Sequence, residues 1–298
     1  MSATMGRRAL VTGIHGFTGR YMVAELERHG YEVSGIGSAP GTEHGYHQVD
    51  LSNVQALREV LAELRPQVVI HLAALAFVGH GNADDFYKVN LIGTRNLLEA
   101  TASSVETPEC VLLASSANVY GNTSEGALDE GTLPAPANDY AVSKLAMEYM
   151  ASLWRDKLPL VITRPFNYTG VGQAGNFLIP KIVDHFRRRA EVIELGNLDV
   201  WRDFSDVRTV VHLYRHLVER LQAIGGTFNI SSGVTYSLRE VVAMCEELTG
   251  HRIELRVNPA FVRANEVRTL SGDNSRARGL LGEWDAVPLR ETLRWMLA

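Results

Sequence analysis

A tyrosine and a lysine lie four residues apart in the segment "NDYAVSK", residues 138–144, and Ser143 directly precedes the lysine. Residues i and i+4 of a helix share one face, so a helical segment would bring the phenol of Tyr140 and the ammonium of Lys144 to one small space. Taken alone, the spacing also fits an amphipathic helix with a half-buried tyrosine. The rest of the chain has to decide whether the pair does chemistry.

A second segment that could take part in the chemistry is "VTGIHGFTGRYMVAELE", in which Gly13, Gly16 and Gly19 have the spacing G-x-x-G-x-x-G. A strand, a glycine turn and a helix start in that order let backbone amides and the helix N-terminus face a pyrophosphate without an intervening side chain. Because the motif opens the first βαβ unit of the chain, it predicts dinucleotide binding.

Both segments need a fold that positions them. Short apolar runs such as "RALVTG", "YEVSGIG", "QVVIHLAA", "CVLLASS" and "LPLVITRP" alternate with helical patterns. Strands separated by helices in this rhythm predict right-handed βαβ crossovers and a parallel sheet that is covered on both faces. The predicted fold class is α/β, a Rossmann-type doubly wound parallel sheet.

The order changes after Pro165, where Gly- and Asn-rich loops replace the alternation, and "SLREVVAMCEELTGHRIELRV" then predicts a helix followed by a strand. We expect a smaller, discontinuous substrate-binding lobe in this part of the chain. The predicted bounds are 1–165 and about 203–232 for the dinucleotide-binding domain, and about 166–202 and 233–298 for the lobe.

Composition excludes several classes of function. A chain of 298 residues with 46% hydrophobic residues can bury a large core, and its net charge of −5 provides no basic field for nucleic acid. Two distant cysteines, Cys110 and Cys245, and ten scattered histidines suggest neither a disulfide framework nor a metal site. No apolar run is long enough to span a membrane and no signal-peptide core precedes the first strand, so we expect a cytoplasmic protein without membrane or nucleic-acid partners.

Five stretches together resemble the extended form of the short-chain dehydrogenase/reductase superfamily. They are the glycine loop, "HLAA" at 71–74, "VNLIGTRNLLEA" from Val89, "LLASSANVYG" at the end of the fifth strand, and Tyr140-x-x-x-Lys144. In that family the lysine holds the nicotinamide ribose and its charge stabilises the phenolate, so a phenol with a pKa of about 10 can exchange a proton near neutral pH.

The resemblance thus implies that Tyr140 and Lys144 are catalytic, and that Ser116 orients the substrate carbonyl. Ser115 is the neighbouring alternative, and either hydroxyl could simply cap the strand end; we favour Ser116 because it directly precedes "ANVYG". No G-x-S-x-G elbow occurs in the chain, so a hydrolase has little support.

The resemblance also implies a set of cofactor contacts. These residues are Gly13, His15, Gly16, Phe17, Thr18, Gly19, Ser38, Asp50, Leu51, Leu72, Ala73, Ala74, Asn90, Ser115, Tyr140, Lys144 and Pro165. NAD enzymes usually place Asp or Glu at the end of the second strand, but Gly37 and Ser38 stand there, and no arginine follows. We therefore predict NADP(H) as the favoured cofactor by a modest margin, with NAD(H) also used.

Extended members of the superfamily mostly transform nucleotide-linked sugars, and the second half of the chain is similar to their substrate lobe. The implied substrate contacts are Ser116, Asn118, Asn167, Asn176, Lys181, Gly196, Asn197, Arg202, Arg263 and Glu266. Among these, Arg202 and Arg263 suit a diphosphate, because a planar guanidinium donates two charge-assisted hydrogen bonds at once.

The residues after Ser116 narrow the reaction. The 4,6-dehydratases of the family carry an acidic residue where this chain has Asn118, and GDP-fucose synthases carry a cysteine where it has Ala117. "GNLDVWRDFSDVRTVVHLY" is most similar to GDP-6-deoxy-4-keto-D-mannose reductases, although Thr209 stands where relatives often have aspartate. The expected reaction is NAD(P)H-dependent reduction of the 4-keto group of GDP-6-deoxy-4-keto-D-mannose to GDP-D-rhamnose.

Two alternatives remain at this point. A nucleotide-sugar 4-epimerase with retained NAD would use the same tyrosine and lysine. A non-catalytic NAD(P)-sensing regulator would keep the glycine loop, but such proteins tend to lose the tyrosine and lysine, which persist here.

The family resemblance further implies a homodimer, in which the helices of about 84–102 and 138–154 form a four-helix bundle. "AMEYMASLW" offers Met147, Tyr149, Met150 and Leu153 as apolar anchors, unless that face covers the protein's own sheet.

Overall fold

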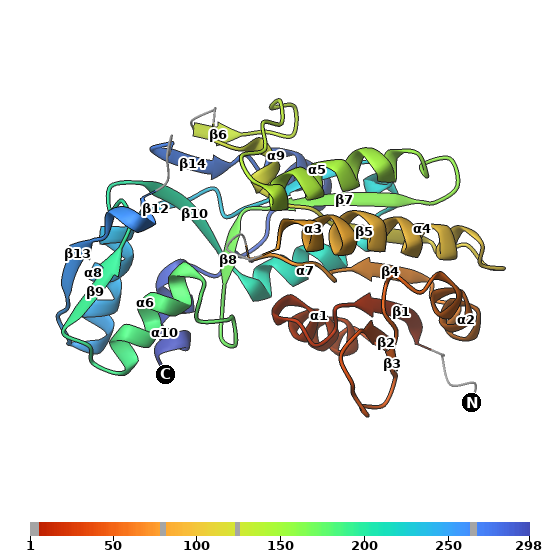
Figure 1. The fold of residues 1–298 in the computed structure, drawn as a ribbon, viewed down its shortest axis with the longest axis horizontal. Helices are drawn as coiled ribbons and strands as arrows, with labels where there is room; N and C mark the ends of the chain where they lie inside the picture. Colours follow the sequence, from red (N-terminus) through yellow and green to blue (C-terminus); the bar gives the residue numbers. More distant parts are fainter. Residues whose placement is uncertain (1–5, 78–81, 123–125, 263–266) are drawn as a thin grey trace. The chain divides into compact units, whose positions relative to one another are not determined.

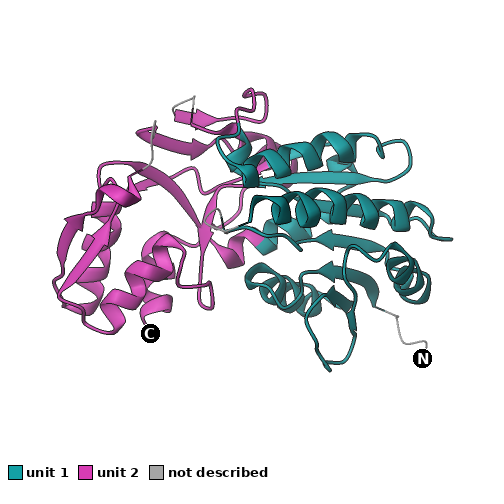
Figure 2. Ribbon diagram, viewed as in Figure 1, with its two compact units in different colours: residues 1–119, 136–164, 211–228 teal, residues 120–135, 165–210, 229–298 magenta. Residues whose placement is uncertain are grey.

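The structure, a computed structural model, describes residues 6–77, 82–122, 126–262 and 267–298. Contacts divide the chain into two compact units, each built from several segments (Figures 1 and 2). Unit 1 comprises residues 1–119, 136–164 and 211–228, and unit 2 comprises residues 120–135, 165–210 and 229–298. Unit 2 thus includes residues 120–135, 165, 203–210 and 229–232, which the sequence bounds placed with the dinucleotide-binding domain.

The first sheet has seven strands in the order β11-β7-β5-β4-β1-β2-β3, and the registers from β7 to β3 are all parallel. The predicted Rossmann-type doubly wound α/β fold is confirmed. The strand order reverses between β1 and β4, so the carboxyl ends of these two strands flank the crevice in which such sheets bind ligands. The strands are β1 (Arg7–Thr12), β2 (Tyr31–Gly37), β3 (Tyr46–Gln48), β4 (Val68–His71), β5 (Cys110–Ala114), β7 (Leu160–Pro165) and β11 (Thr227–Ile230).

Helices cover this sheet in two layers. α2, α4 and α5 pack side by side, and their apolar faces share a core with the strands; Leu57, Leu97 and Met147 in this core are fully buried. α1 and α7 are joined by side-chain contacts elsewhere in the unit. The helical segments are α1 (Phe17–Arg28), α2 (Val54–Leu64), α3 (Ala83–Phe86), the π-helix η1 (Tyr87–Gly93), α4 (Thr94–Ala102), η2 (Ala117–Tyr120), α5 (Asp139–Ser152), α7 (Val207–Val218) and η3 (Leu221–Ala223).

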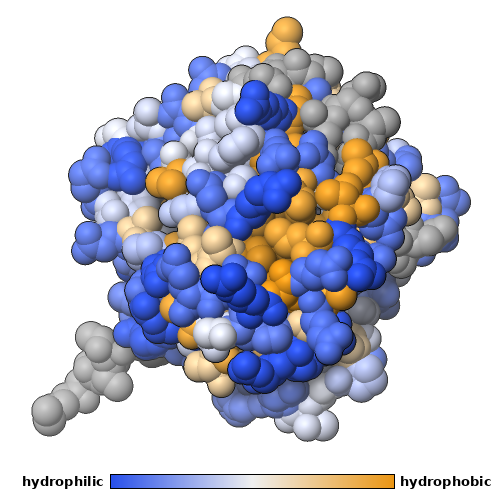
Figure 3. Space-filling model, turned by 90° about the vertical axis from the view of Figure 1, so that its left-hand side faces the viewer, coloured by the Kyte–Doolittle hydropathy of each residue, from blue (hydrophilic) through white to orange (hydrophobic). Residues whose placement is uncertain are grey.

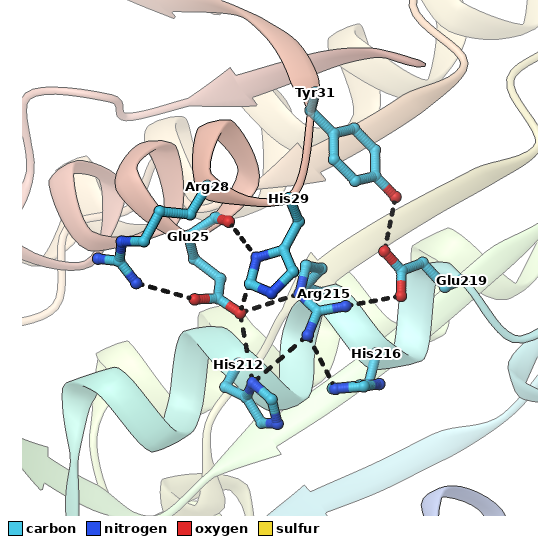
Figure 4. Close-up of polar contacts among 8 residues, drawn as sticks. All are labelled: Glu25, Arg28, His29, Tyr31, His212, Arg215, His216 and Glu219. Atoms are coloured by element: carbon cyan, nitrogen blue, oxygen red, sulfur yellow. Dashed lines mark hydrogen bonds and ion pairs between the residues drawn. The ribbon is translucent and has the colours of Figure 1, made fainter. Parts of the chain in front are cut away.

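A buried polar cluster joins α1 to α7 (Figure 4). Nε of Arg215 donates to Oε1 of Glu25 at 2.9 Å, and its Nη1 donates to Oε2 of Glu219 at 2.8 Å. Burial raises the pKa of Glu25, but the hydrogen bond from Arg215 and the neighbouring histidines outweigh it, so the pKa of Glu25 lies below its ordinary value. Glu219 in turn accepts a hydrogen bond from the hydroxyl of Tyr31, which ties the start of β2 to the same cluster.

Unit 2 contains a five-stranded sheet, in which β12, β10, β14 and β6 lie in that order and β8 pairs with β10, and a parallel pair of β13 and β9. Helices α6, α8 and α10 pack on one another around an apolar core. The elements are β6 (Gly126–Leu128), β8 (Asn167–Thr169), α6 (Leu178–Arg187), β9 (Val192–Leu195), β10 (Trp201–Asp206), β12 (Thr235–Ser237), α8 (Leu238–Thr249), β13 (Glu254–Val257), η4 (Pro259–Phe261), β14 (Thr269–Gly272), α9 (Ser275–Leu281) and α10 (Leu289–Leu297).

Some apolar side chains of unit 2 remain in contact with solvent. Val257, Phe261 and Val262 are 53%, 50% and 43% exposed. The face drawn in Figure 3 carries an apolar area bordered by polar side chains. No helix in the described ranges has both the length and the apolar character that a membrane crossing requires.

Thr209 stands in the first turn of α7, at a position where relatives often have aspartate, and the helix begins without that acid. Asp206, three residues earlier, caps α7, because its Oδ1 accepts a hydrogen bond from the backbone N–H of Arg208 at 2.7 Å. The hydroxyl of Thr209 instead accepts from the backbone N–H of Val287 at 3.2 Å.

The outer face of α5 differs in part from the sequence prediction. Met147 is fully buried and belongs to the core under the helix, so its prediction as an exposed anchor is wrong. Met150 packs partly against the same core. Tyr149 and Leu153 are 65% and 79% exposed, and they are the two residues of the four that are mostly exposed to solvent.

Candidate active site

The glycine loop between β1 and α1 has room for backbone only. Gly13 has a φ of +69°, and a Cβ there would lie 2.8 Å from backbone atoms of Ala73. A Cβ on Gly19 would lie 2.2 Å from the carbonyl oxygen of Gly13. Gly16 precedes α1 without a side-chain cap, so the first amides of the helix point to the loop. This cradle of backbone amides at a helix N-terminus fits the pyrophosphate of a dinucleotide.

Lys144 reaches from α5 to the end of β5. Its Nζ donates to the carbonyl oxygen of Ala114 at 2.7 Å, and the side chain is buried. Burial lowers the pKa of this ammonium to about 8, although the carboxylate of Glu148 one turn further on raises it. Tyr140 lies one turn earlier on the helix and is 7% exposed. The structure therefore places the predicted pair at the carboxyl end of the sheet.

α5 begins where it must for this placement. Asn138 is its N-cap, and its side chain accepts a hydrogen bond from the backbone N–H of Ala141 at 2.9 Å. An N-cap asparagine satisfies one of the free amides of the first turn. "NDYAVSK" therefore starts a helix that puts Tyr140 in its first turn.

The two serines that follow β5 have different partners. The hydroxyl of Ser115 donates to Oε1 of Glu148 at 2.5 Å, so it is engaged inside the protein. The hydroxyl of Ser116 accepts from the backbone N–H of Asn118 at 3.1 Å, and among the contacts of the described residues it donates to no other group. Of the two serines, Ser116 is thus the one whose hydroxyl can donate a hydrogen bond to a ligand.

A π-helix lies beside the helix that carries Tyr140 and Lys144. η1 contacts α5, and Asn90 within it is fully buried. Nδ2 of Asn90 donates to Oγ of Ser143 and to the carbonyl oxygen of Leu75, while its Oδ1 accepts from the N–H of Leu75. The predicted cofactor residue Asn90 therefore holds the loop after β4 and the helix of the Tyr-Lys pair together.

A chain of three buried side chains continues from this point, and the sequence prediction missed it as a unit. Thr12 bonds to Nδ1 of His71 at 2.7 Å, and Nε2 of His71 bonds to Thr94 at 2.8 Å. Thr94 donates to the carbonyl oxygen of Asn90, so it accepts from Nε2–H of the histidine. Oγ1 of Thr12 accepts from two backbone N–H groups, so its own proton goes to Nδ1, and His71 is neutral. Burial, together with the nearby Lys144 ammonium, lowers the pKa of His71 to about 3.

The same threonine fixes the loop after β4. Oγ1 of Thr12 accepts hydrogen bonds from the backbone N–H groups of Leu72 and Ala73 at 3.1 and 3.0 Å. These two residues and Ala74 were predicted to contact the cofactor, and backbone atoms of Leu72 and Ala73 lie against Gly13 of the glycine loop. The motif "HLAA" is thus held by one hydroxyl of the first strand.

The predicted cofactor residues Ser38 and Asp50 follow β2 and β3, and His15 lies in the glycine loop between β1 and α1. Nε2 of His15 lies 3.5 Å from Oε1 of Glu43, and its ring lies 4.3 Å from the ring of Tyr46. The hydroxyl of Tyr46 donates to the carbonyl oxygen of Gly37 at 2.9 Å, next to Ser38. No acidic residue stands at the end of β2, but the carboxylate of Glu43 lies beside His15 of the glycine loop.

The remaining predicted cofactor residues in unit 1 have local roles. Asp50 accepts from the backbone N–H of Ser52 at 2.7 Å, and the carbonyl oxygen of Leu51 accepts from Asn96. Phe17 lies in the first turn of α1 with its ring 5.6 Å from that of Tyr21. Thr18 follows it in the helix.

Two of the predicted substrate residues, Ser116 and Asn118, lie in unit 1. Unit 2 holds the described others, Asn167, Asn176, Lys181, Gly196, Asn197 and Arg202, and the predicted cofactor residue Pro165. Nζ of Lys181 donates to the carbonyl oxygen of Glu194 and lies 4.3 Å from the ring centroid of Phe261. A Cβ on Gly196 would lie 2.5 Å from the carbonyl oxygen of Phe261, so Lys181 and Gly196 meet around this one residue, which the sequence prediction missed.

The other predicted substrate residues of this unit have contacts that do not involve Phe261. Nδ2 of Asn167 donates to the carbonyl oxygen of Asp203, and Arg202 donates to that of Val267. Asn176 is exposed in the loop before α6, and Asn197 caps a turn by accepting from the N–H of Asp199. Arg263 and Glu266 lie outside the described residues. Within the part of the chain that the structure describes, no three His, Cys, Asp or Glu side chains gather as metal ligands would.

Comparison with known proteins defines the class to which this fold and site belong. The family model described as GDP-mannose 4,6-dehydratase matches residues 10–296. The chain therefore belongs to this family, and the predicted membership of the extended short-chain dehydrogenase/reductases is confirmed.

Two curated relatives are similar over almost the whole chain. GDP-6-deoxy-D-talose 4-dehydrogenase of Aggregatibacter actinomycetemcomitans is 36% identical, and the match covers 92% of this chain and 91% of that protein. GDP-6-deoxy-D-mannose reductase of Pseudomonas aeruginosa is 32% identical, with 99% and 97% covered.

Solved structures agree with these matches. A protein from Burkholderia cenocepacia J2315 is 52% identical, with a TM-score of 0.92 over 98% of this chain and 97% of that one. RMD from Pseudomonas aeruginosa, solved in complex with NADPH, is 30% identical, with a TM-score of 0.86 over 98% and 97%.

Proposed function

We propose that this chain is an NAD(P)H-dependent oxidoreductase that reduces the 4-keto group of a GDP-linked 6-deoxy-4-keto sugar, with GDP-6-deoxy-4-keto-D-mannose as the substrate and GDP-D-rhamnose as the product. The observation that carries the proposal is the arrangement at the end of β5, where Lys144 bonds to Ala114 and Ser116 follows two residues later. The two curated relatives support the substrate class, because both act on GDP-6-deoxy sugars and one is a 4-dehydrogenase.

Each catalytic residue has one task in the proposed reaction. The hydroxyl of Ser116 donates to the keto oxygen, and Tyr140 gives its proton to that oxygen as the carbonyl becomes an alcohol. The buried ammonium of Lys144 stabilises the phenolate that remains on Tyr140. A reduced nicotinamide, when bound, supplies the hydride that the carbonyl carbon needs. The glycine loop, Asn90 and the "HLAA" segment are the proposed holders of that cofactor.

Membership in a family named for a dehydratase does not assign that reaction to this chain. Elimination of water needs an acid and a base beyond the Tyr-Lys pair. Asn118 stands two residues after Ser116, where the dehydratases carry an acid, and its backbone N–H bonds back to Ser116. Hydride transfer without elimination is therefore the proposed chemistry.

The substrate-binding role of unit 2 is also a proposal. Lys181, Gly196, Asn197 and Arg202 are the proposed contacts to the nucleotide, with Asn167 and Asn176 toward the sugar. Phe261, with Lys181 beside its ring, adds an exposed aromatic surface on which a base could stack.

A second product has specific support. GDP-6-deoxy-D-talose differs from GDP-D-rhamnose only in the configuration at C4, and the 36%-identical relative is named for the talose sugar. Which face of the carbonyl receives the hydride decides between the two products.

The test uses purified protein, NADPH and GDP-6-deoxy-4-keto-D-mannose. Stoichiometric loss of the 340 nm absorbance is expected, and the coupling constants at H4 in the NMR spectrum of the product give its configuration. A 4-epimerase with retained NAD would instead interconvert 4-epimeric sugar nucleotides without net consumption of NADPH. Binding of NADPH with no turnover of any GDP- or UDP-linked 4-keto sugar would favour a sensor and contradict the proposal.

A further inference from the structure

A buried ion pair lies directly behind the catalytic helix. Arg164 at the end of β7 donates from Nε to Oε1 of Glu148 at 3.0 Å and from Nη2 to Oε2 at 2.6 Å. The two side chains are only 9% and 8% exposed. The hydroxyl of Ser115 completes the carboxylate's partners. Glu148 is thus bound by a two-pronged guanidinium and a serine, an arrangement that fixes the position of its carboxylate.

This pair has little reason to exist for stability alone. The cost of removing two charges from water commonly offsets their attraction, so a buried ion pair adds little net stability over apolar residues. The position of the pair is informative instead: Glu148 is four residues after Lys144 on α5, so the carboxylate and the ammonium lie on the same face of the helix.

Without Glu148, the surroundings of Lys144 would favour the uncharged form of its side chain, because burial lowers the pKa of the ammonium. The ammonium is buried, and it donates a hydrogen bond to the carbonyl oxygen of Ala114 on β5. The titratable groups around it are Tyr140 and Glu148 on its own helix, His71 on β4, which is neutral, and Arg164 on β7, which is occupied by Glu148. Glu148 is the group among these that supplies a fixed negative charge.

We propose that Glu148, held by Arg164 and Ser115, is a positioning residue that keeps Lys144 charged, and that it sets the upper pH limit at which the Tyr140–Lys144 pair works. This inference rests on the proposed function of Lys144. Loss of the carboxylate removes the charge that favours the ammonium, so Lys144 gives up its proton at lower pH. The uncharged lysine can no longer stabilise the phenolate of Tyr140.

The chain contains only four lysines, which makes a direct titration practical. Lysine labelled with ¹³C at Cε gives signals for residues 88, 144, 157 and 181, and the variant Lys144→Met assigns the signal of Lys144. We expect Lys144 to titrate near pH 8 in the wild type and about 1 pH unit lower in Glu148→Gln. The other three lysines should not shift.

Glu148→Gln leaves Arg164 buried without its partner and could therefore misfold. A second variant avoids this unpaired charge. Glu148→Gln with Arg164→Met replaces the ion pair by neutral groups of similar volume, and it should shift the titration of Lys144 in the same direction. Glu99→Gln is the matched control, because it breaks an exposed glutamate–arginine pair with Arg58 elsewhere in unit 1. It should leave the titration of Lys144 unchanged.

If the role of the ion pair were purely structural, its removal would lower the stability of the protein but leave the titration midpoint of Lys144 unchanged. An unchanged midpoint for Lys144 in both Glu148 variants therefore overturns the proposal. Since the titration needs neither cofactor nor sugar, a wrong substrate assignment would not affect it. With the substrate that proves active, the alkaline limb of the kcat/KM profile should move to lower pH by the same amount in the two Glu148 variants and stay in place in Glu99→Gln.

Discussion

Nδ2 of Asn90 donates a hydrogen bond to Oγ of Ser143 at 3.0 Å, and neither residue is exposed to solvent. Ser143 donates in turn to the backbone carbonyl oxygen of Tyr140 at 2.7 Å. Through this one serine, the π-helix is connected to the backbone of the proposed catalytic tyrosine. The serine that precedes the lysine in "NDYAVSK" therefore has a structural function.

This relationship predicts unequal effects of two alanine substitutions. Asn90→Ala leaves both backbone groups of Leu75 and the hydroxyl of Ser143 without their partner, whereas Ser143→Ala removes one hydroxyl. Each buried polar group left unsatisfied costs about 1–3 kcal/mol. Urea denaturation should show a loss of more than about 2 kcal/mol for Asn90→Ala and about 1 kcal/mol for Ser143→Ala. Equal losses would show that the bonds to Leu75 contribute nothing.

His71 predicts a pH dependence of stability. Its pKa in the folded chain is about 3, while an unfolded chain takes up the proton near pH 6.5. Above pH 6.5 both states are neutral and the full stability is present; as the pH falls, the unfolded state gains a proton that the folded state cannot bind. Stability is lost by up to about 1.4 kcal/mol per pH unit, down to about pH 3.

The measurement compares the wild type with His71→Gln by urea denaturation at pH 7 and pH 5. The difference in unfolding free energy between the two pH values should be larger in the wild type by about 1.5–2 kcal/mol. Other titrating groups, such as Glu25, are common to both proteins and cancel. Parallel pH curves for the two proteins would mean that His71 accepts a proton in the folded state.

Tyr140→Phe tests the proposed acid. The substitution keeps the ring and its packing beside Phe86, but it removes the proton that the reduced carbonyl needs. Turnover should fall by about 10²–10⁴-fold, and affinity for the nicotinamide cofactor should change little, because Lys144 and the glycine loop remain. Ser116→Ala should cost less. Retention of more than about a tenth of wild-type turnover, where chemistry limits the rate, would remove Tyr140 from this role.

Cofactor preference depends on the surroundings of His15. We predict a modest preference for NADPH over NADH, because Ser38 can donate to a 2′-phosphate. The carboxylate of Glu43, which lies beside His15 in the glycine loop, would limit this preference by repelling that phosphate. Glu43→Gln should therefore raise the ratio of kcat/KM for NADPH to that for NADH. Steady-state kinetics with both cofactors measure this ratio; a wild-type preference for NADH above about tenfold would contradict the first prediction.

The exposed apolar residues of α5 support the predicted homodimer. Leu153 is 79% exposed at the end of the helix, and Tyr149 is exposed one turn earlier. Light scattering at micromolar concentration should give about twice the 32.9 kDa chain mass for the wild type. Leu153→Glu should shift the mass toward one chain, whereas Leu133→Glu, at a position 84% exposed in unit 2, should not. A wild-type mass near one chain would exclude the dimer.

The sequence predicted the sheet well because its strands are buried on both faces and read as unbroken apolar runs. β4 and β5 illustrate this, since "VVIH" and "CVLLA" are buried almost throughout. The glycine loop and the Tyr-Lys pair could be proposed as a site for a related reason: their proposed function depends on spacing within a single segment.

Features that depend on contacts between distant segments could not be predicted in this way. Met147 faces the core because of the rotation of α5 about its axis. The weakly amphipathic sequence of this helix did not predict that rotation. The pairing of Glu148 with Arg164 joins a helix to a strand, and each residue alone resembles an ordinary surface charge. Glu43 reaches the glycine loop through a turn whose path no local pattern specifies.

The π-helix from Tyr87 to Gly93 can be regarded as an ordinary helix with one inserted residue. Deletion of a single residue within it would restore regular α-helical hydrogen bonding and turn α3 by about 100° relative to α4. Asn90 could then no longer face Leu75 and Ser143 together. The length of this segment is therefore under tighter constraint than most of its side chains, and a loss of one residue would be felt at Tyr140, which lies some 50 positions further along the chain.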